Sequence, residues 1–146
     1  VIGAGLYAAF CSQQYADTHD DLSIDAVDWI SWSESRAHLP EARLYRQLVG
    51  REPALASDNL VVQIEACRNG AGVLLMPAGW GEVTADAVQL PGLAPIALDF
   101  NTYLVTHRAL RRVPRIDAVW RWLEGLLMAL RALTVNAARP GPPAPG

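Results

Sequence analysis

The chain of 146 residues contains no lysine, because all twelve of its basic residues are arginines, and it contains only two cysteines. With 15 acidic residues the formal net charge is −3, so the clustered positive charge typical of a nucleic-acid surface is missing. Two cysteines are too few for a disulfide framework. Neither of the long apolar stretches, residues 66–80 and 119–133, is as long and uninterrupted as the roughly 20 residues that cross a bilayer.

Metal sites and several catalytic motifs are also missing. His19, His38 and His107 are far apart, and the sequence contains neither H-E-x-x-H nor C-x-x-C. A P-loop and the G-x-S-x-G sequence of a nucleophile elbow are absent as well. Residues 1–5 carry no positive charge and do not read as a signal peptide. We therefore expect a cytoplasmic protein that has no metal site and does not bind a membrane.

Apolar residues make up 51% of the chain, which also carries five Trp, four Tyr and two Phe. This composition excludes disorder for most of the chain and is sufficient for a core. Strand-like and helix-like segments alternate, which predicts an α/β fold with a sheet that is at least partly parallel. The predicted strands lie near residues 6–9, 25–30, 53–56, 73–76 and 96–106. The predicted helices lie near residues 12–16, 40–49, 60–68 and from 114 onward.

The sequence Ser57-Asp58-Asn59 follows a predicted strand and precedes a predicted helix in which Leu60, Val61, Ile64 and Cys67 should face the core. A helix start in this position offers free backbone N–H groups and a hydroxyl to an anion, whereas the simpler interpretation is an ordinary N-cap.

The polar loop after the strand near residue 30 is equally ambiguous. Trp32 and Ser33 combine an aromatic wall with a hydroxyl donor, which suits a small polar ligand but also fits an ordinary turn.

Residues 3–8 match the dinucleotide-binding pattern G-x-G-x-x-G/A, in which small residues let a pyrophosphate approach a helix start. The pattern needs a preceding strand, and only Val1 and Ile2 precede it, although Asp25 is an acceptable distal acid. A Rossmann-type nucleotide-binding enzyme therefore stays open as an alternative, beside loop glycines that have no such role.

Four segments, taken in order, resemble the effector-binding domain of LysR-type transcriptional regulators. They are L-Y-A-A at residues 6–9 with Tyr15, S-D-N-L at 57–60, G-A-G-V-L-L-M-P at 70–77, and Y-L-V-T-H-R at 103–108 followed by L-R-R-V-P-R-I at 110–116. The resemblance extends over most of the chain and concerns the C-terminal part of that domain. It implies a protein that is not an enzyme and has no cofactor.

This resemblance implies a periplasmic-binding-protein-like (type 2) fold of two subdomains joined by two crossing strands, with a small-molecule effector in the cleft between them. Residues 1–10 would be one crossing, 11–98 the second subdomain, 99–133 the return strand and the C-terminal helix of the first subdomain, and 134–146 a disordered tail rich in Pro and Gly. The implied ligand-binding residues are Ser57, Asp58, Trp32, Ser33, Met76 and Pro77, and the implied hinge residues are Ala8, Ala9, Asn101 and Thr102.

The effector implied by the resemblance is an anion or an aromatic acid. Ala9-Phe10 stands where the family has a hydroxyl residue and a proline, which favours a more apolar effector or a partly filled cleft. The chain has no winged helix-turn-helix, so it is expected to be an incomplete fragment that reaches DNA only through that missing domain. An apolar stripe from Ile116 to Leu130 lacks a partner in the fragment, which predicts a homo-oligomer. A solute-binding protein with the same fold is a second alternative.

Overall fold

The computed structural model describes residues 3–137, with the side chains of residues 5–81, 84–98 and 103–129. The chain divides into two compact units. The larger unit is Gly5–Asp99, and the smaller one contains the described residues before Gly5 and after Asp99.

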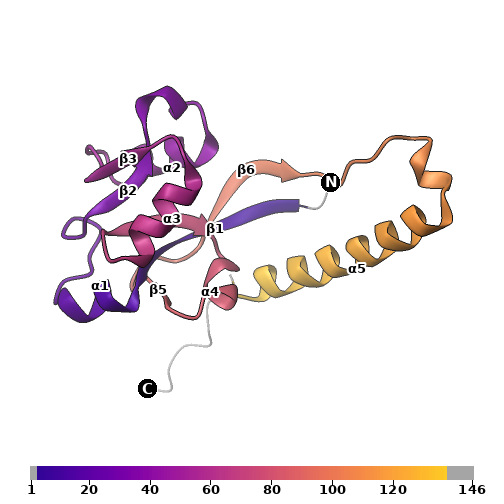
Figure 1. Cartoon of the computed structure of the whole chain (residues 1–146). Helices are drawn as coiled ribbons and strands as arrows, with labels where there is room; N and C mark the ends of the chain where they lie inside the picture. Colours follow the sequence, from indigo (N-terminus) through magenta and orange to yellow (C-terminus); the bar gives the residue numbers. More distant parts are fainter. Residues whose placement is uncertain (1–2, 138–146) are drawn as a thin grey trace, which may run out of the picture. The chain divides into compact units, whose positions relative to one another are not determined.

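The larger unit is a mixed α/β fold around one open sheet (Figure 1). Its strands are β1 (Gly3–Ser12), β2 (Trp29–Trp32), β3 (Leu55–Ser57), β4 (Val73–Pro77), β5 (Ala87–Gln89) and β6 (Ile96–Thr102), of which β1 and β6 continue into the smaller unit. Its helices are α1 (Gln13–Thr18), α2 (Pro40–Leu48), α3 (Leu60–Arg68) and α4 (Trp80–Val83), with a short 3-10 helix, η1 (Glu34–Arg36).

The strand order is β3-β2-β4-β1-β5, and β6 also pairs with β1. Strand β2 is parallel to both β3 and β4, whereas β1 is antiparallel to β4 and β5. The prediction of an α/β fold with a partly parallel sheet is therefore confirmed.

Helices α2 and α3 cover opposite faces of this sheet. Trp29 of β2 contacts Tyr45 of α2 edge-on, with ring centroids 5.9 Å apart. The next residue, Ile30, belongs to a buried cluster with Cys67 of α3 and with side chains of β1 and β4. Because neighbouring residues of a strand point to opposite faces, the two contacts assign the two helices to different sides.

Local chemistry explains where the helices begin and end. The hydroxyl of Ser12 accepts a hydrogen bond from the N–H of Tyr15 at 3.2 Å and so caps α1. Pro40 is the first residue of α2, where its missing N–H has no cost, and Gly50 follows the helix with φ of +65°. The predictions for these two positions are confirmed.

The predicted strand at residues 25–30 begins later than expected, because β2 starts only at Trp29. The N–H groups of Ala26 and Val27 bond to the carbonyl of Ser23 and form a turn. Arg51 donates to the carbonyl of Val27 at 2.6 Å, which satisfies that oxygen without a strand partner. The strand predicted to reach residue 106 ends at Thr102.

The predicted inward face of α3 is wrong in part. Leu60 and Val61 are 40% and 65% exposed, whereas Gln63 is fully buried together with Cys67. A helix buries residues four apart on one face, and here that pair is Gln63 and Cys67. The apolar residues at the start of the helix therefore face solvent, and a polar side chain occupies the core position.

The glycine motif at residues 3–8 lies inside β1, where Ala8 pairs with Met76 of β4. A dinucleotide-binding fingerprint requires these residues in a turn between a strand and a helix. The structure contradicts that requirement, so this support for a nucleotide-binding enzyme is lost.

In the smaller unit, the 3-10 helix η2 (Leu110–Arg112) precedes the long helix α5 (Pro114–Ala137). The prediction that Pro114 begins the last helix is confirmed, and Arg111 lies over the ring of Trp120, 4.0 Å from its centroid. Residues 134–137 of the predicted tail continue α5, and residues 138–146 lie outside the described part. None of the helices in the described part combines the length and the hydropathy of a membrane-spanning segment.

Candidate functional site

The residues that the sequence points to for ligand binding gather at one edge of the sheet. Because β2, β3 and β4 are parallel, their carboxyl ends lie together, and Trp32 pairs with Ser57 at the ends of β2 and β3. Pro77 ends β4 and pairs with Tyr7 of the antiparallel β1. We call this region, formed by the ends of β2, β3 and β4, the sheet edge.

The connections at the sheet edge separate to opposite faces. The loop after β2 leads to α2, and the loop after β3 leads to α3, which covers the other side. In open α/β sheets, a ligand crevice forms where neighbouring strands send their connections to opposite sides. The sheet edge has this arrangement between β2 and β3.

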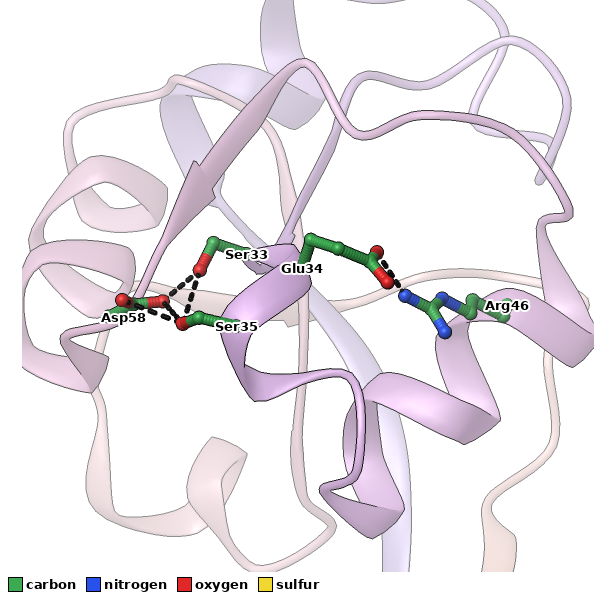
Figure 2. A network of polar contacts seen from close by, with 5 residues as sticks. All are labelled: Ser33, Glu34, Ser35, Arg46 and Asp58. Atoms are coloured by element: carbon green, nitrogen blue, oxygen red, sulfur yellow. Dashed lines mark hydrogen bonds and ion pairs between the residues drawn. The ribbon is translucent and has the colours of Figure 1, made fainter.

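Hydrogen bonds between side chains join the loop after β2 to the loop after β3 (Figure 2). We call this group, Ser33, Ser35 and Asp58, the clasp. Ser35 Oγ lies 2.8 Å from both carboxylate oxygens of Asp58, and Ser33 Oγ donates to Asp58 Oδ1. The two hydroxyls are 3.2 Å apart. The clasp places Ser33 and Asp58 at one point, although they come from different connections.

The start of α3 is satisfied by its own side chains. Asn59 Oδ1 accepts from the N–H of Val61 at 2.9 Å, so Asn59 is the N-cap. The hydroxyl of Ser57 accepts from the N–H of Asn59 at 3.1 Å, and it lies 3.4 Å from the Asn59 carbonyl oxygen. Because the carboxylate of Asp58 lies at this helix start, it repels an incoming anion there.

Gln63 is a site residue that the sequence reasoning missed. Its side chain is completely buried, and its Nε2 donates to the carbonyl of Ser57 at 2.7 Å. Its Oε1 is buried without a hydrogen-bond partner among the described residues. The only sequence signal was a glutamine within an otherwise apolar helical stretch, which by itself is common on solvated faces.

Tyr7 and Glu41 join β1 to the first turn of α2. The hydroxyl of Tyr7 donates to Glu41 Oε1 at 2.8 Å. Burial raises the pKa of Tyr7, and the hydrogen bond and charge of Glu41 raise it further. Tyr7 therefore remains a protonated donor and holds the Glu41 carboxylate in place beside the sheet edge.

Two arginines line a cavity beside the sheet edge. This cavity, of about 390 Å³ on the α2 side, is lined by Trp32, Ser33, Arg46 and Arg51, among others. Arg46 forms an ion pair with Glu34 (Figure 2), and Arg51 bonds to the carbonyl of Val27. The charge of Arg46 is thus partly offset by Glu34, whereas Arg51 keeps its positive charge.

The other residues singled out from the sequence have different positions. Met76 is buried in the core cluster and Pro77 is exposed. Phe10 packs in the same cluster, so its ring is part of the core. Both cysteines are free and buried, and burial raises the pKa of Cys67 to about 12.

The predicted hinge residues lie on either side of the division between the units. Ala8 and Ala9 are buried in β1 within the larger unit and pair with β4. Asn101 and Thr102 belong to the smaller unit, since the division falls after Asp99. Their role as a hinge stays a prediction.

The last two observations on the site concern metal binding and similarity to known proteins. Within the described residues, no group of three or more His, Cys, Asp or Glu side chains could hold a metal ion. No family model, curated protein or solved structure matches this chain. The chemistry of the sheet edge must therefore be argued from its own residues.

Proposed function

We propose that the chain senses a small molecule as part of the effector-binding domain of a LysR-type transcriptional regulator. The observation that carries this proposal is the convergence of Trp32, Ser33, Ser57 and Asp58 at the sheet edge. Local chemistry and motif resemblance both indicate these residues from the sequence, and a ligand site requires them to be close together. The mixed α/β sheet is compatible with the periplasmic-binding-protein-like (type 2) fold that the resemblance implies.

The proposed mechanism is a shift of population. An effector that binds more tightly when the clasp is formed than when it is open increases the population of the conformation with the clasp formed. The loops after β2 and β3 are the parts that respond, because the clasp between Ser33, Ser35 and Asp58 joins them only through side chains. In the proposed regulator, oligomer contacts pass this change to a DNA-binding domain outside this chain.

A thermal-shift screen with a panel of small carboxylates, amines and aromatic acids tests the proposal. A ligand at one hundred times its Kd raises the free energy of unfolding by about 2.7 kcal/mol. We expect at least one compound to stabilise the chain, and Trp32→Ala to lose that stabilisation. Tyr103→Ala, at an exposed aromatic residue outside both the sheet edge and α5, is the control and should keep it.

Either of two results would reject a ligand site at the sheet edge. One is a panel in which no compound stabilises the chain, and the other is equal stabilisation of the Trp32→Ala variant. The coding DNA before Val1 separates the functional classes: a winged helix-turn-helix supports the regulator, and a leader peptide supports a solute-binding protein.

The proposal includes a homo-oligomer formed through α5. The exposed side chains of Val119, Trp122 and Leu126 share one face of this helix, and exposed apolar patches mark interaction surfaces. Sedimentation velocity should show self-association that Trp122→Glu reduces and Glu124→Gln does not. A chain that stays monomeric at all concentrations would exclude this part of the proposal.

A further inference from the structure

A small cavity lies where strands β2 and β4 separate. Their pairing ends at Ile30 and Leu74, whereas β2 continues to Trp32 and β4 to Pro77. The cavity is lined by residues of β2 and β4 and by Glu41 and Gln63. Glu41 comes from α2 and Gln63 from α3, so residues from helices on both faces of the sheet line this gap.

The buried amide of Gln63 presents an acceptor in this region. Its Nε2 donates to the Ser57 carbonyl at 2.7 Å, and the opposite amide orientation would place two oxygens against each other. The orientation is therefore fixed, and Oε1 is the atom left without a partner. A buried acceptor without a donor costs about 1–3 kcal/mol, so a bound donor here is favoured.

The charge around the cavity is negative. Glu41 is the charged residue of its lining, and Asp58 follows Ser57, the residue that pairs with Trp32 of the lining. Arg46 and Arg51 line the larger cavity on the α2 side and are not part of the lining of this one. An anion would be repelled by the carboxylates, whereas a cation would gain their attraction and that of an aromatic ring such as Trp32.

The volume of the cavity, about 10 Å³, is close to that of a single water-sized probe. It therefore accepts one small group and not a whole ligand. Trp32 and Glu41 are only partly buried, so the remainder of a ligand can lie outside the gap, against these two side chains.

We propose that this gap determines the specificity of the sensor by taking the protonated amino group of an effector, with Gln63 Oε1 and the Glu41 carboxylate as acceptors. The inference rests on the proposed function and replaces the anionic effector that the resemblance implies with a primary amine. It assigns a role to Gln63 and Glu41, neither of which the sequence motifs indicate.

Three probes of matched shape test the proposal on the full chain labelled with ¹⁵N: benzylamine, benzyl alcohol and benzoate. At neutral pH, we expect benzylamine at millimolar concentration to shift the side-chain amide signals of Gln63 in a saturable way. Benzyl alcohol should bind more weakly, because it is an uncharged donor, and benzoate should leave these signals unchanged.

Two variants identify the acceptors. Glu41→Gln keeps an oxygen for the Tyr7 hydroxyl but removes the charge, and it should weaken benzylamine binding about fivefold. Gln63→Met keeps the side-chain length and should abolish binding. Glu65→Gln, at an exposed residue of α3, is the control and should bind as the original chain does. If Gln63→Met does not fold, the comparison of Glu41→Gln with Glu65→Gln still decides the matter.

The outcomes separate this inference from the proposed function. If benzoate shifts the signals of the sheet edge and benzylamine does not, the amine specificity is wrong while a ligand site remains. Equal benzylamine affinity of Glu41→Gln and Glu65→Gln also overturns the inference. If no probe shifts the Gln63 signals and its amide contacts a bound water, the gap binds water only and the inference is wrong. The proposed function is then tested by the thermal-shift screen with Trp32→Ala.

Discussion

Asp58 is the residue through which the loops after β2 and β3 are joined, because its carboxylate accepts from the hydroxyls of both Ser33 and Ser35. Asp58→Ala removes both acceptors and should lower the free energy of unfolding by about 1 kcal/mol, since the contacts are exposed to solvent. Urea unfolding measures this loss. Asp58→Asn keeps one acceptor oxygen and should lose less. Equal stability of the alanine variant and the original chain would contradict a stabilising clasp.

Cys67 provides a pH-dependent test of the core. Burial, and secondarily the nearby Cys11, raises its pKa from 9.0 to about 12. Between these values the unfolded chain loses the thiol proton and the folded chain keeps it, so the free energy of unfolding falls as pH rises. The decrease from this thiol is at most about 1.4 kcal/mol per pH unit.

The contribution of Cys67 is isolated by comparison with Cys67→Ala, because burial also raises the pKa of Tyr7 and Tyr45, and these tyrosines ionise in this range only when the chain unfolds. In urea unfolding above pH 9, the original chain should lose stability more steeply than the variant does. Below pH 9 the difference between the two should be constant. Parallel pH profiles throughout the range would show that the folded chain does not suppress ionisation of this thiol.

At the residue scale, the sequence indicated Ser33 and Asp58 but not their contact, and it did not indicate Gln63. The motifs report residue types near the ends of predicted strands, which is enough to place Trp32 and Ser57 at one edge. The role of Gln63 depends on a main-chain carbonyl of Ser57 and on a gap between two strands. Both arise only when distant segments pack together, so local sequence cannot show them.

Among the elements, α3 gives the clearest test of which helix face is buried. Val61 is 65% exposed, so Val61→Gln should change the free energy of unfolding by no more than about 0.5 kcal/mol. Ile64 packs against the buried cluster, and Ile64→Gln should cost about 2 kcal/mol or more, because an amide is then placed against apolar side chains. Thermal and urea unfolding measure both. A larger loss for Val61→Gln would restore the helix face predicted from the sequence.

The elements that sequence predicted best are those bounded by proline or glycine. Pro40 and Pro114 begin α2 and α5, because a proline fits the first turn of a helix and no later one. Elements without such boundaries were placed less well. The start of β2 depends on the turn at Ser23, and on a hydrogen bond from Arg51 that spans 24 positions of the chain.

At the scale of the whole molecule, one of the two units contains the proposed ligand site. The sheet edge lies entirely in the larger unit, Gly5–Asp99. The α/β class could be predicted from the sequence, because the class follows from the alternation of strands and helices along the chain. The gap between β2 and β4 could not be predicted, because residues of β2, α2, α3 and β4 that are far apart in the sequence line it together.

The absence of lysine makes trypsin a selective probe of the two units, since only arginine bonds can be cut. Arg108, Arg111 and Arg112 are exposed in the segment between β6 and α5, which contains only turns and the short helix η2. Arg51 is held by a main-chain carbonyl, and Arg68 lies within α3. We therefore expect the first cuts after Arg108, Arg111 or Arg112, because cleavage requires local opening of the backbone.

Mass spectrometry of a brief digest identifies the first products, and replacing these three arginines with glutamine should slow the first cut. A first cut after Arg51 or Arg68 would mean that the larger unit opens before the segment that follows β6. In that case the sheet edge would not be preorganised, and ligand binding there would require ordering of the unit. A resistant fragment that spans the larger unit and still binds benzylamine would locate the sensing site within that unit.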